Sequence, residues 1–476
     1  MNITFNTALT MHFRPGKARP RKSRRRPDLA RIVEVCEPRT LLTFPFEIVG
    51  NQFLRDGEPV FLNAVGYQPL QPGQSIPDPL DEGRVLEDLR RMAPMSAGPE
   101  PFALRLYPQP TAALPRRMPQ SFWDTAREQE MWIIRDMFFT DDVTDIEDAR
   151  AKVDAVISEV AQAGAFDRIW AWEIGNEYIG YNNAPALQGF LAQMRDYIKQ
   201  QVRLIGGEGV SDWVTWGSPP IHDLLRTAAM PPGAPVDSAV PIEIDFDYVT
   251  YNIYSYDPTG LRDHQGGKVT GTPYEGYLEA LRAETERRFG PVPLMIGEVG
   301  LPDSPATSAG EPEQGYLTPV YPSYRKGGLS SEQVAEGLID LYFAARLGGN
   351  VAGLAFFEWN DEWHKSGTPG SQDHPEEFFG LNAFVTDVFG TTELHHKPQY
   401  YAAVEMVTMN FREDLQAALM VETSSLAPGQ VTTVTVTLPQ KLTGSIRYRW
   451  ESSRGHIVGD GATAQFLAGD VVLGDA

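Results

Sequence analysis

Cysteine is nearly absent from this chain of 476 residues, in which Cys36 is the only one. A disulfide framework and a cysteine-based metal site are therefore excluded. No run of about 18 apolar residues occurs, which argues against a membrane-spanning helix. The eight histidines show neither a His-x-His nor an HExxH spacing, so we expect no catalytic metal and no cofactor.

Positive charge is scarce beyond the first forty residues. The formal net charge is -22, although residues 1–40 hold ten lysines and arginines against three acidic residues. So acidic a remainder repels nucleic acids and anionic membranes, whereas a neutral sugar is unaffected. We therefore expect a carbohydrate partner and no nucleic acid, while the oligomeric state stays open.

The first 43 residues differ in composition from the rest. The stretch RPGKARPRKSRRRP is too basic and proline-rich to pack into a core, so residues 1–43 are predicted to be a disordered leader. By itself the stretch also fits a nucleic-acid arm. It ends in VEVCEPRTLL, which resembles the LE-x-R-x-LL segment of the basic leader of many planctomycete extracellular proteins, with Cys36 where leucine is common. An apolar signal core of about 7 to 15 residues is missing. The resemblance implies an extracellular, periplasmic or cell-surface protein.

From residue 44 onward, short apolar runs alternate with helical segments. Two helices carry start and stop signals, one from Thr144-x-x-Glu147 to Gly164 and one from Ser330-x-x-Gln333 to Gly348. Eight runs have the length of buried strands, at 59–67, 101–108, 131–139, 168–177, 212–220, 246–256, 293–300 and 351–359. Eight strands separated by helices predict an α/β fold, a (β/α)8 TIM barrel over residues 44–412.

The sequence pattern changes again after residue 412. Residues 413–476 show alternating polarity, many threonines and valines, and Pro/Gly turns. This pattern predicts a small all-β, sandwich-like module. It is shorter than a full sandwich of about 100 residues, so we expect a minimal or truncated domain.

Two carboxylates stand at predicted strand tips. The fourth run ends in Asn176-Glu177, the only Asn-Glu pair in the chain, and the seventh contains Glu298 within MIGEVG. Catalytic groups of a (β/α)8 barrel lie at the C-terminal ends of its strands, so these carboxylates are expected to face each other across the mouth. A glycosidase needs such a pair, one to protonate the departing oxygen and one to attack the sugar or direct water.

An Asn-Glu at strand 4 and a lone Glu at strand 7 together resemble the clan A retaining glycoside hydrolases, over about residues 44–412. The resemblance implies that Glu177 is the acid/base and Glu298 the nucleophile, with Asn176 bound to the sugar 2-hydroxyl. The opening EIVGNQFLRDGEPVFLNAVGYQP also resembles the entry of family 2 and family 5 barrels, where a short hairpin precedes strand 1. The third strand departs from family 5, because it ends in FFTD without the histidine that many members have there.

Three further residues fit the same resemblance. It implies that Arg105 in LRLYP holds the nucleophile ionised, that Tyr254 in YNIYSY lies near it, and that Trp359 in FFEWNDEW is the platform under the sugar. The register of strand 6 leaves Tyr251 and Tyr256 as alternatives to Tyr254. As purely structural alternatives, the arginine would form a rim salt bridge and the aromatic residues would only pack.

The predicted function is a retaining glycoside hydrolase that cleaves a β-linked oligo- or polysaccharide, such as a glucan or mannan, by double displacement. Glu173, four residues before Glu177, is interpreted as a supporting acid. A transglycosylase would use the same two glutamates, and a carbohydrate-binding barrel without turnover is the third alternative. The sugar, the linkage and the choice between endo and exo action are not encoded in any recognisable pattern.

Overall fold

The computed structural model describes residues 44–74, 78–107, 117–137, 145–176, 184–217, 245–253, 273–304, 329–364, 372, 377–388, 390–409, 419–421, 431–436, 456–458 and 463–467. The predicted leader at 1–43 lies outside these ranges, and so do Glu177 and Tyr254. Within them, no helix combines the length and the apolar character needed to cross a membrane.

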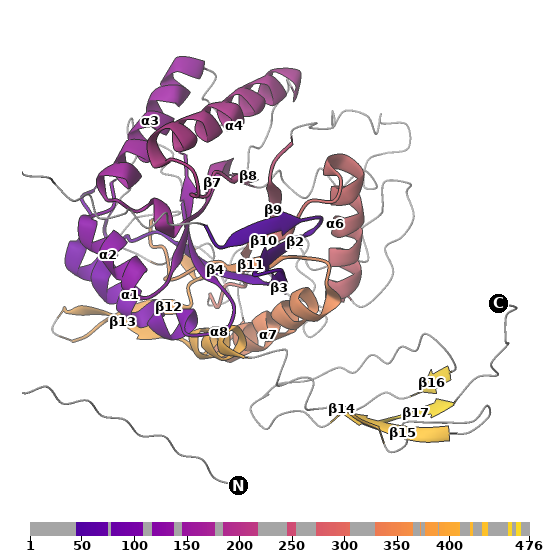
Figure 1. The fold of residues 1–476 in the computed structure, drawn as a ribbon. Helices are drawn as coiled ribbons and strands as arrows, with labels where there is room; N and C mark the ends of the chain where they lie inside the picture. The colour runs from indigo at the N-terminus through magenta and orange to yellow at the C-terminus, as the bar shows by residue number, and fades with distance from the viewer. Residues whose placement is uncertain are drawn as a thin grey trace, which may run out of the picture. The chain divides into compact units, whose positions relative to one another are not determined.

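A closed barrel of eight parallel strands forms the centre of the fold (Figure 1). The strands follow one another around the barrel in chain order, and β11 closes the ring on β4. They are β4 (Leu62–Tyr67), β5 (Phe102–Leu106), β6 (Trp132–Asp136), β7 (Ile169–Asn176), β8 (Val214–Gly217), β9 (Tyr248–Ile253), β10 (Leu294–Val299) and β11 (Gly353–Phe356). Each lies within a predicted run, which confirms the (β/α)8 barrel.

Helices cover the outside of the barrel (Figure 1). Those in the described ranges are α1 (Glu82–Ser96), α2 (Gln120–Glu128), α3 (Ile146–Gln162), α4 (Ala184–Gly206), α6 (Pro273–Phe289), α7 (Ser331–Gly348) and α8 (Pro398–Thr408), with a short 3-10 helix at Phe166–Arg168. The predicted capping box of Ser330 and Gln333 is present at the start of α7. Helix α3 differs from its prediction, because its cap is the carboxylate of Asp145, which accepts from the N–H of Glu147, and not Thr144.

An aromatic plug closes the end of the barrel where the strands begin. The predicted hairpin is part of an antiparallel sheet of β1 (Phe46–Val49), β2 (Gln52–Arg55) and β3 (Glu58–Val60). The ring of Phe46 lies 4.6 Å from that of Trp170, and Phe53 lies 5.2 Å from Tyr248. Because this end is filled by aromatic rings, a candidate site is expected at the opposite end, where the strands finish.

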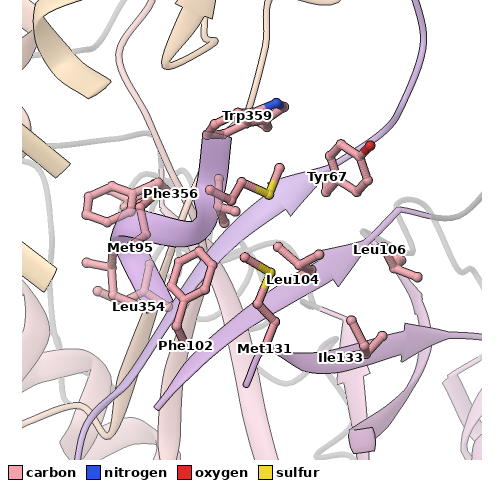
Figure 2. Close-up of a cluster of buried hydrophobic side chains, with 14 of the residues drawn as sticks. Tyr67, Met95, Phe102, Leu104, Leu106, Met131, Ile133, Leu354, Phe356 and Trp359 are labelled. Atoms are coloured by element: carbon pink, nitrogen blue, oxygen red, sulfur yellow. The ribbon is translucent and has the colours of Figure 1, made fainter. Parts of the chain in front are cut away.

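A second apolar layer lies between the strands and the helices. Figure 2 shows part of it, including Leu104 and Leu106 of β5 and Leu354 and Phe356 of β11. Alternate residues of the same strands, such as Ala103, point inward and belong to the inner cluster. Strand alternation therefore decides which side chains can reach the mouth.

Two smaller antiparallel sheets follow the barrel strands in sequence. One pairs β12 (Asn382–Thr386) with β13 (Thr392–His396). The other has the order β14-β15-β17-β16 and consists of β14 (Leu419–Val421), β15 (Val431–Val436), β16 (His456–Val458) and β17 (Thr463–Leu467). The described strands after residue 412 are thus all β, while the domain boundary at 412/413 stays a prediction.

Candidate active site

Polar side chains replace the aromatic ones where the barrel strands end. The group comprises Arg105 of β5, Glu173 and Asn176 of β7, Asn252 of β9 and Glu298 of β10. All but Asn176 are buried, and Glu298 is 3% exposed. The described residues contain no cluster of histidine, cysteine and carboxylate groups that would hold a metal ion.

Arg105 is the centre of this group, because each of its nitrogens donates to a different neighbour. Its Nε lies 2.9 Å from Glu173 Oε2 and 3.1 Å from Oε1. Its Nη1 lies 2.7 Å from Glu298 Oε1, and its Nη2 lies 2.8 Å from Asn176 Oδ1. The guanidinium is a rigid planar fork, so these contacts fix the positions of the three partners relative to one another.

Asn176 connects the arginine to two further strands. Its Oδ1 also accepts from Asn252 Nδ2 at 3.2 Å, and its Nδ2 donates to Glu298 Oε1 at 3.4 Å. Asn252 was not among the predicted site residues. The available signal was alternation along YNIYSY: Tyr251 packs in the outer apolar cluster, so its neighbour Asn252 faces inward.

Glycine and a β-bulge precede both strand-tip residues. The pairing of β7 with β8 shifts register between Ile174 and Asn176, and that of β10 with β9 shifts between Ile296 and Glu298. Gly175 has φ of 61°, a left-handed conformation that favours glycine. A bulge re-aims the side chain that follows it, so the Ile-Gly-Asn and Ile-Gly-Glu sequences turn their polar residues into the mouth.

The Gly175→Ala variant should therefore lower both stability and activity. Forcing alanine to φ of 61° costs about 1–2 kcal/mol in the free energy of unfolding, and relief of the strain displaces Asn176. Urea unfolding and kcat/KM measure the two effects. Gly164→Ala is the matched control, because Gly164 has φ of 62° after α3 with open space around it. Equal activity in the two variants would contradict the role given to the bulge.

Burial and opposite charges set the ionisation of the buried group. Burial by itself would lower the pKa of Arg105, but the carboxylates of Glu173 and Glu298 raise it well above its usual value. Burial raises the pKa of Glu173, and the charge of Arg105 opposes that shift. The guanidinium therefore stays cationic and is shared between two carboxylates.

Tyr107 lies beside this group and was not predicted. Its hydroxyl accepts from Arg105 Nη1 at 3.4 Å, and its ring packs over Gly66, where a Cβ would overlap the phenol. Burial, reinforced by the charge of Glu298, raises the pKa of Tyr107 well above its usual value. The phenol is therefore a neutral hydroxyl next to the candidate nucleophile. The motif LRLYP contains it, but a tyrosine after a strand is not by itself a functional signal.

The side chain of Trp359 packs in the outer apolar cluster and not inside the barrel, unlike the predicted platform. The side chain is fully buried there (Figure 2). Its ring lies 5.9 Å from that of Tyr400 in α8. A buried ring has no face open to a sugar, so the structure does not support Trp359 as a platform. The aromatic ring of this segment that contacts the site is Phe357, whose centroid lies 5.7 Å from that of Tyr107.

Arg105, Asn176 and Glu298 come together, and Glu173 joins them as the buried acid that the sequence indicated. Glu177 and Tyr254 lie outside the described residues, so their predicted roles stay predictions. At the mouth, the carboxylate of Glu298 is held by the guanidinium of Arg105 and the amide of Asn176.

Comparisons with known proteins add fold similarity only. No protein-family model and no curated protein sequence matches the chain. Solved structures with a similar fold include a GH2 β-galacturonidase from Eisenbergiella tayi bound to galacturonate, with 14% identity, a TM-score of 0.49, and coverage of 76% of this chain and 54% of that one. A β-glucuronidase from Parabacteroides merdae has 12% identity and a TM-score of 0.48, with 82% and 44% covered. A Ruminococcus gnavus β-glucuronidase in complex with D-glucuronic acid has 14% identity and a TM-score of 0.46, with 76% and 51% covered. The chain thus spans about half the length of these proteins, and at this similarity they assign it no activity.

Proposed function

We propose that the chain is a retaining glycoside hydrolase that cleaves a β-linked oligo- or polysaccharide by double displacement. One observation carries the proposal: Glu298 sits at the tip of a barrel strand, with Arg105 Nη1 2.7 Å from its Oε1 and Asn176 on the same oxygen. A carboxylate held in this way is suited to attack an electrophilic carbon. Glu177, the next residue after Asn176, is the proposed proton donor.

The proposed reaction has two steps. Glu298 attacks the anomeric carbon, the glycosidic bond breaks, and Glu177 gives its proton to the departing oxygen. The sugar is then an ester of Glu298. Glu177, now a carboxylate, takes a proton from water, which attacks the same carbon and releases Glu298. Two displacements at one carbon leave the anomeric configuration unchanged.

Asn176 and Tyr107 have supporting parts in this proposal. Asn176 Oδ1 already accepts from Arg105 and Asn252, so its amide nitrogen, beside Glu298, is the group left for the sugar 2-hydroxyl. The neutral phenol of Tyr107 can donate a hydrogen bond to the ring region of a substrate. The contact with the 2-hydroxyl strengthens in the transition state.

The proposed substrate is a neutral sugar. Among the described residues that contact Glu298, Arg105 is the cation, and its nitrogens already donate to Glu173, Glu298 and Asn176. A uronic acid would bring a further carboxylate close to Glu173 and Glu298, and like charges brought together are unfavourable by several kcal/mol. The contrast is with the β-glucuronidases and the β-galacturonidase named above, which share only the fold.

A substrate panel tests the proposed function. Aryl β-glucoside, β-mannoside, β-galactoside and β-glucuronide are compared with β-glucans and mannans, by release of the phenol or of reducing ends. We expect turnover of at least one neutral β-glycoside, with kcat/KM at least about 100-fold above that for the glucuronide. A preference for the glucuronide would contradict the neutral-sugar assignment. Sugar binding without product from any substrate would favour a non-catalytic barrel.

Two expectations from the sequence remain part of the proposal. Export to an extracellular, periplasmic or cell-surface location is supported only by the resemblance of the leader. The module at 413–476 is proposed to be a separate, sandwich-like unit, supported by the antiparallel strands described there.

A further inference from the structure

Glu173 is a buried acid that the proposed reaction does not use directly. It lies in the middle of β7, fully buried, and both of its carboxylate oxygens accept from Arg105 Nε. Thr250 Oγ1 lies 3.5 Å from its Oε1. Because its side chain has no exposed surface, Glu173 would act on a substrate only through other residues.

The position of Arg105 depends on this contact. Two carboxylate oxygens on a single Nε hold that edge of the guanidinium, and the planar group then aims Nη1 at Glu298 and Nη2 at Asn176. A carboxylate shortened or rotated at Glu173 would tilt the plane. A tilt displaces Glu298 and Asn176 together, because the guanidinium of Arg105 holds both of them.

The charges around Glu173 determine how strongly Arg105 attracts Glu298. The titratable groups are Arg105 on β5, Asp136 on β6, which is the register partner of Glu173, and Glu298 on β10. Burial raises the pKa of the Tyr248 phenol on β9 well above its usual value, so this group is neutral. On β8 the register partner is the uncharged Thr215. Arg105 forms ion pairs with both Glu173 and Glu298. The negative charge of Glu173 partly neutralises Arg105, so Arg105 attracts Glu298 less strongly than it would alone.

We propose that Glu173 is a positioning residue for the nucleophile. It fixes the plane of the Arg105 guanidinium and partly neutralises its positive charge, so that Glu298 keeps both its orientation and its reactivity. The inference rests on the proposed function. It separates two contributions, charge and geometry, which different substitutions remove.

The test compares Glu173→Gln and Glu173→Asp with wild type on a substrate found in the panel. Glu173→Gln keeps the shape and removes the charge, so Arg105 binds Glu298 more strongly. We expect kcat to fall roughly tenfold and the acidic limb of kcat/KM to move about one pH unit lower. Glu173→Asp keeps the charge and loses reach. We expect its acidic limb to stay in place while kcat falls up to about 100-fold.

The matched control is Glu159→Gln. Glu159 of α3 is a buried glutamate paired with a buried arginine, Arg135, at 3.1 Å, outside the barrel interior. It should lose stability and keep kcat and the pH profile. If both Glu173 variants behave like this control, the positioning role is wrong. That result differs from failure of the proposed function, in which wild type is inactive or Glu298→Gln is active. If Glu173→Gln does not fold, an unchanged kcat in Glu173→Asp would still overturn the inference.

Discussion

Glu298→Gln should abolish turnover while leaving the protein folded. Glutamine has the shape of glutamate but cannot form the glycosyl ester, so kcat is expected to fall by at least about 10³-fold. Arg105 Nη1 can still donate to the amide oxygen in place of Glu298 Oε1, and the neighbouring strands keep their packing. The measurement is the rate on the best neutral substrate, with folding followed by circular dichroism. Undiminished activity would remove Glu298 as the nucleophile.

A second substitution at this position separates a missing nucleophile from a damaged site. Glu298→Ala leaves a space beside Arg105 that a small anion can enter. Azide should restore part of the rate with an activated aryl glycoside and yield the α-glycosyl azide, because it attacks from the face that Glu298 used. Glu159→Gln, with azide present, should show neither the loss nor the new product.

Arg105→Gln should be the most destabilising single substitution in the mouth. It leaves Glu173 and Glu298 buried without their cation, and breaking a buried pair in this way costs about 3–5 kcal/mol in the free energy of unfolding. Activity should fall as well, since neither the nucleophile nor Asn176 is held. Urea unfolding and kcat are the measurements. Arg135→Gln is the matched control, because it removes a buried arginine with a carboxylate partner outside the mouth and should cost stability alone.

The pH dependence of the Arg105→Gln variant has a definite sign. Burial already raises the pKa of Glu173 in the wild type, and removing the adjacent cation raises it further. A carboxyl whose pKa is higher in the folded than in the unfolded chain favours folding in its protonated form. The variant should therefore recover stability below the ordinary glutamate pKa of about 4.3 and lose it as pH rises through the raised pKa of Glu173. Stability that increases with pH in this range would contradict the charge balance described.

The strands and the polar residues at their tips were predictable because both follow from local pattern. An apolar run bounded by turns predicts a buried strand, and eight of them predict the barrel that is observed. Asn176 and Glu298 follow from reading the fourth and seventh predicted strands to their ends, whereas Arg105 was implied by the resemblance. Their contact through one guanidinium was not predictable from sequence, because it depends on the register of four strands.

The errors also have physical causes. Asp145 rather than Thr144 caps α3, since an aspartate one residue closer to the helix satisfies the same N–H groups and adds favourable charge. Trp359 lies just beyond the end of β11, where strand alternation no longer says which way a side chain points. It packs against Tyr400 of α8, and Phe357 takes the position next to Tyr107.

The covalent intermediate gives the most direct test of Glu298 as the nucleophile. A 2-deoxy-2-fluoro-β-glycoside with a dinitrophenyl leaving group, in the gluco, manno and galacto forms, forms the ester quickly and hydrolyses it slowly. Mass spectrometry of the digested protein should find one sugar per chain on the peptide that carries Glu298, and none in Glu298→Gln. A sugar attached to a different residue, or a first product of inverted anomeric configuration, would contradict the proposed mechanism.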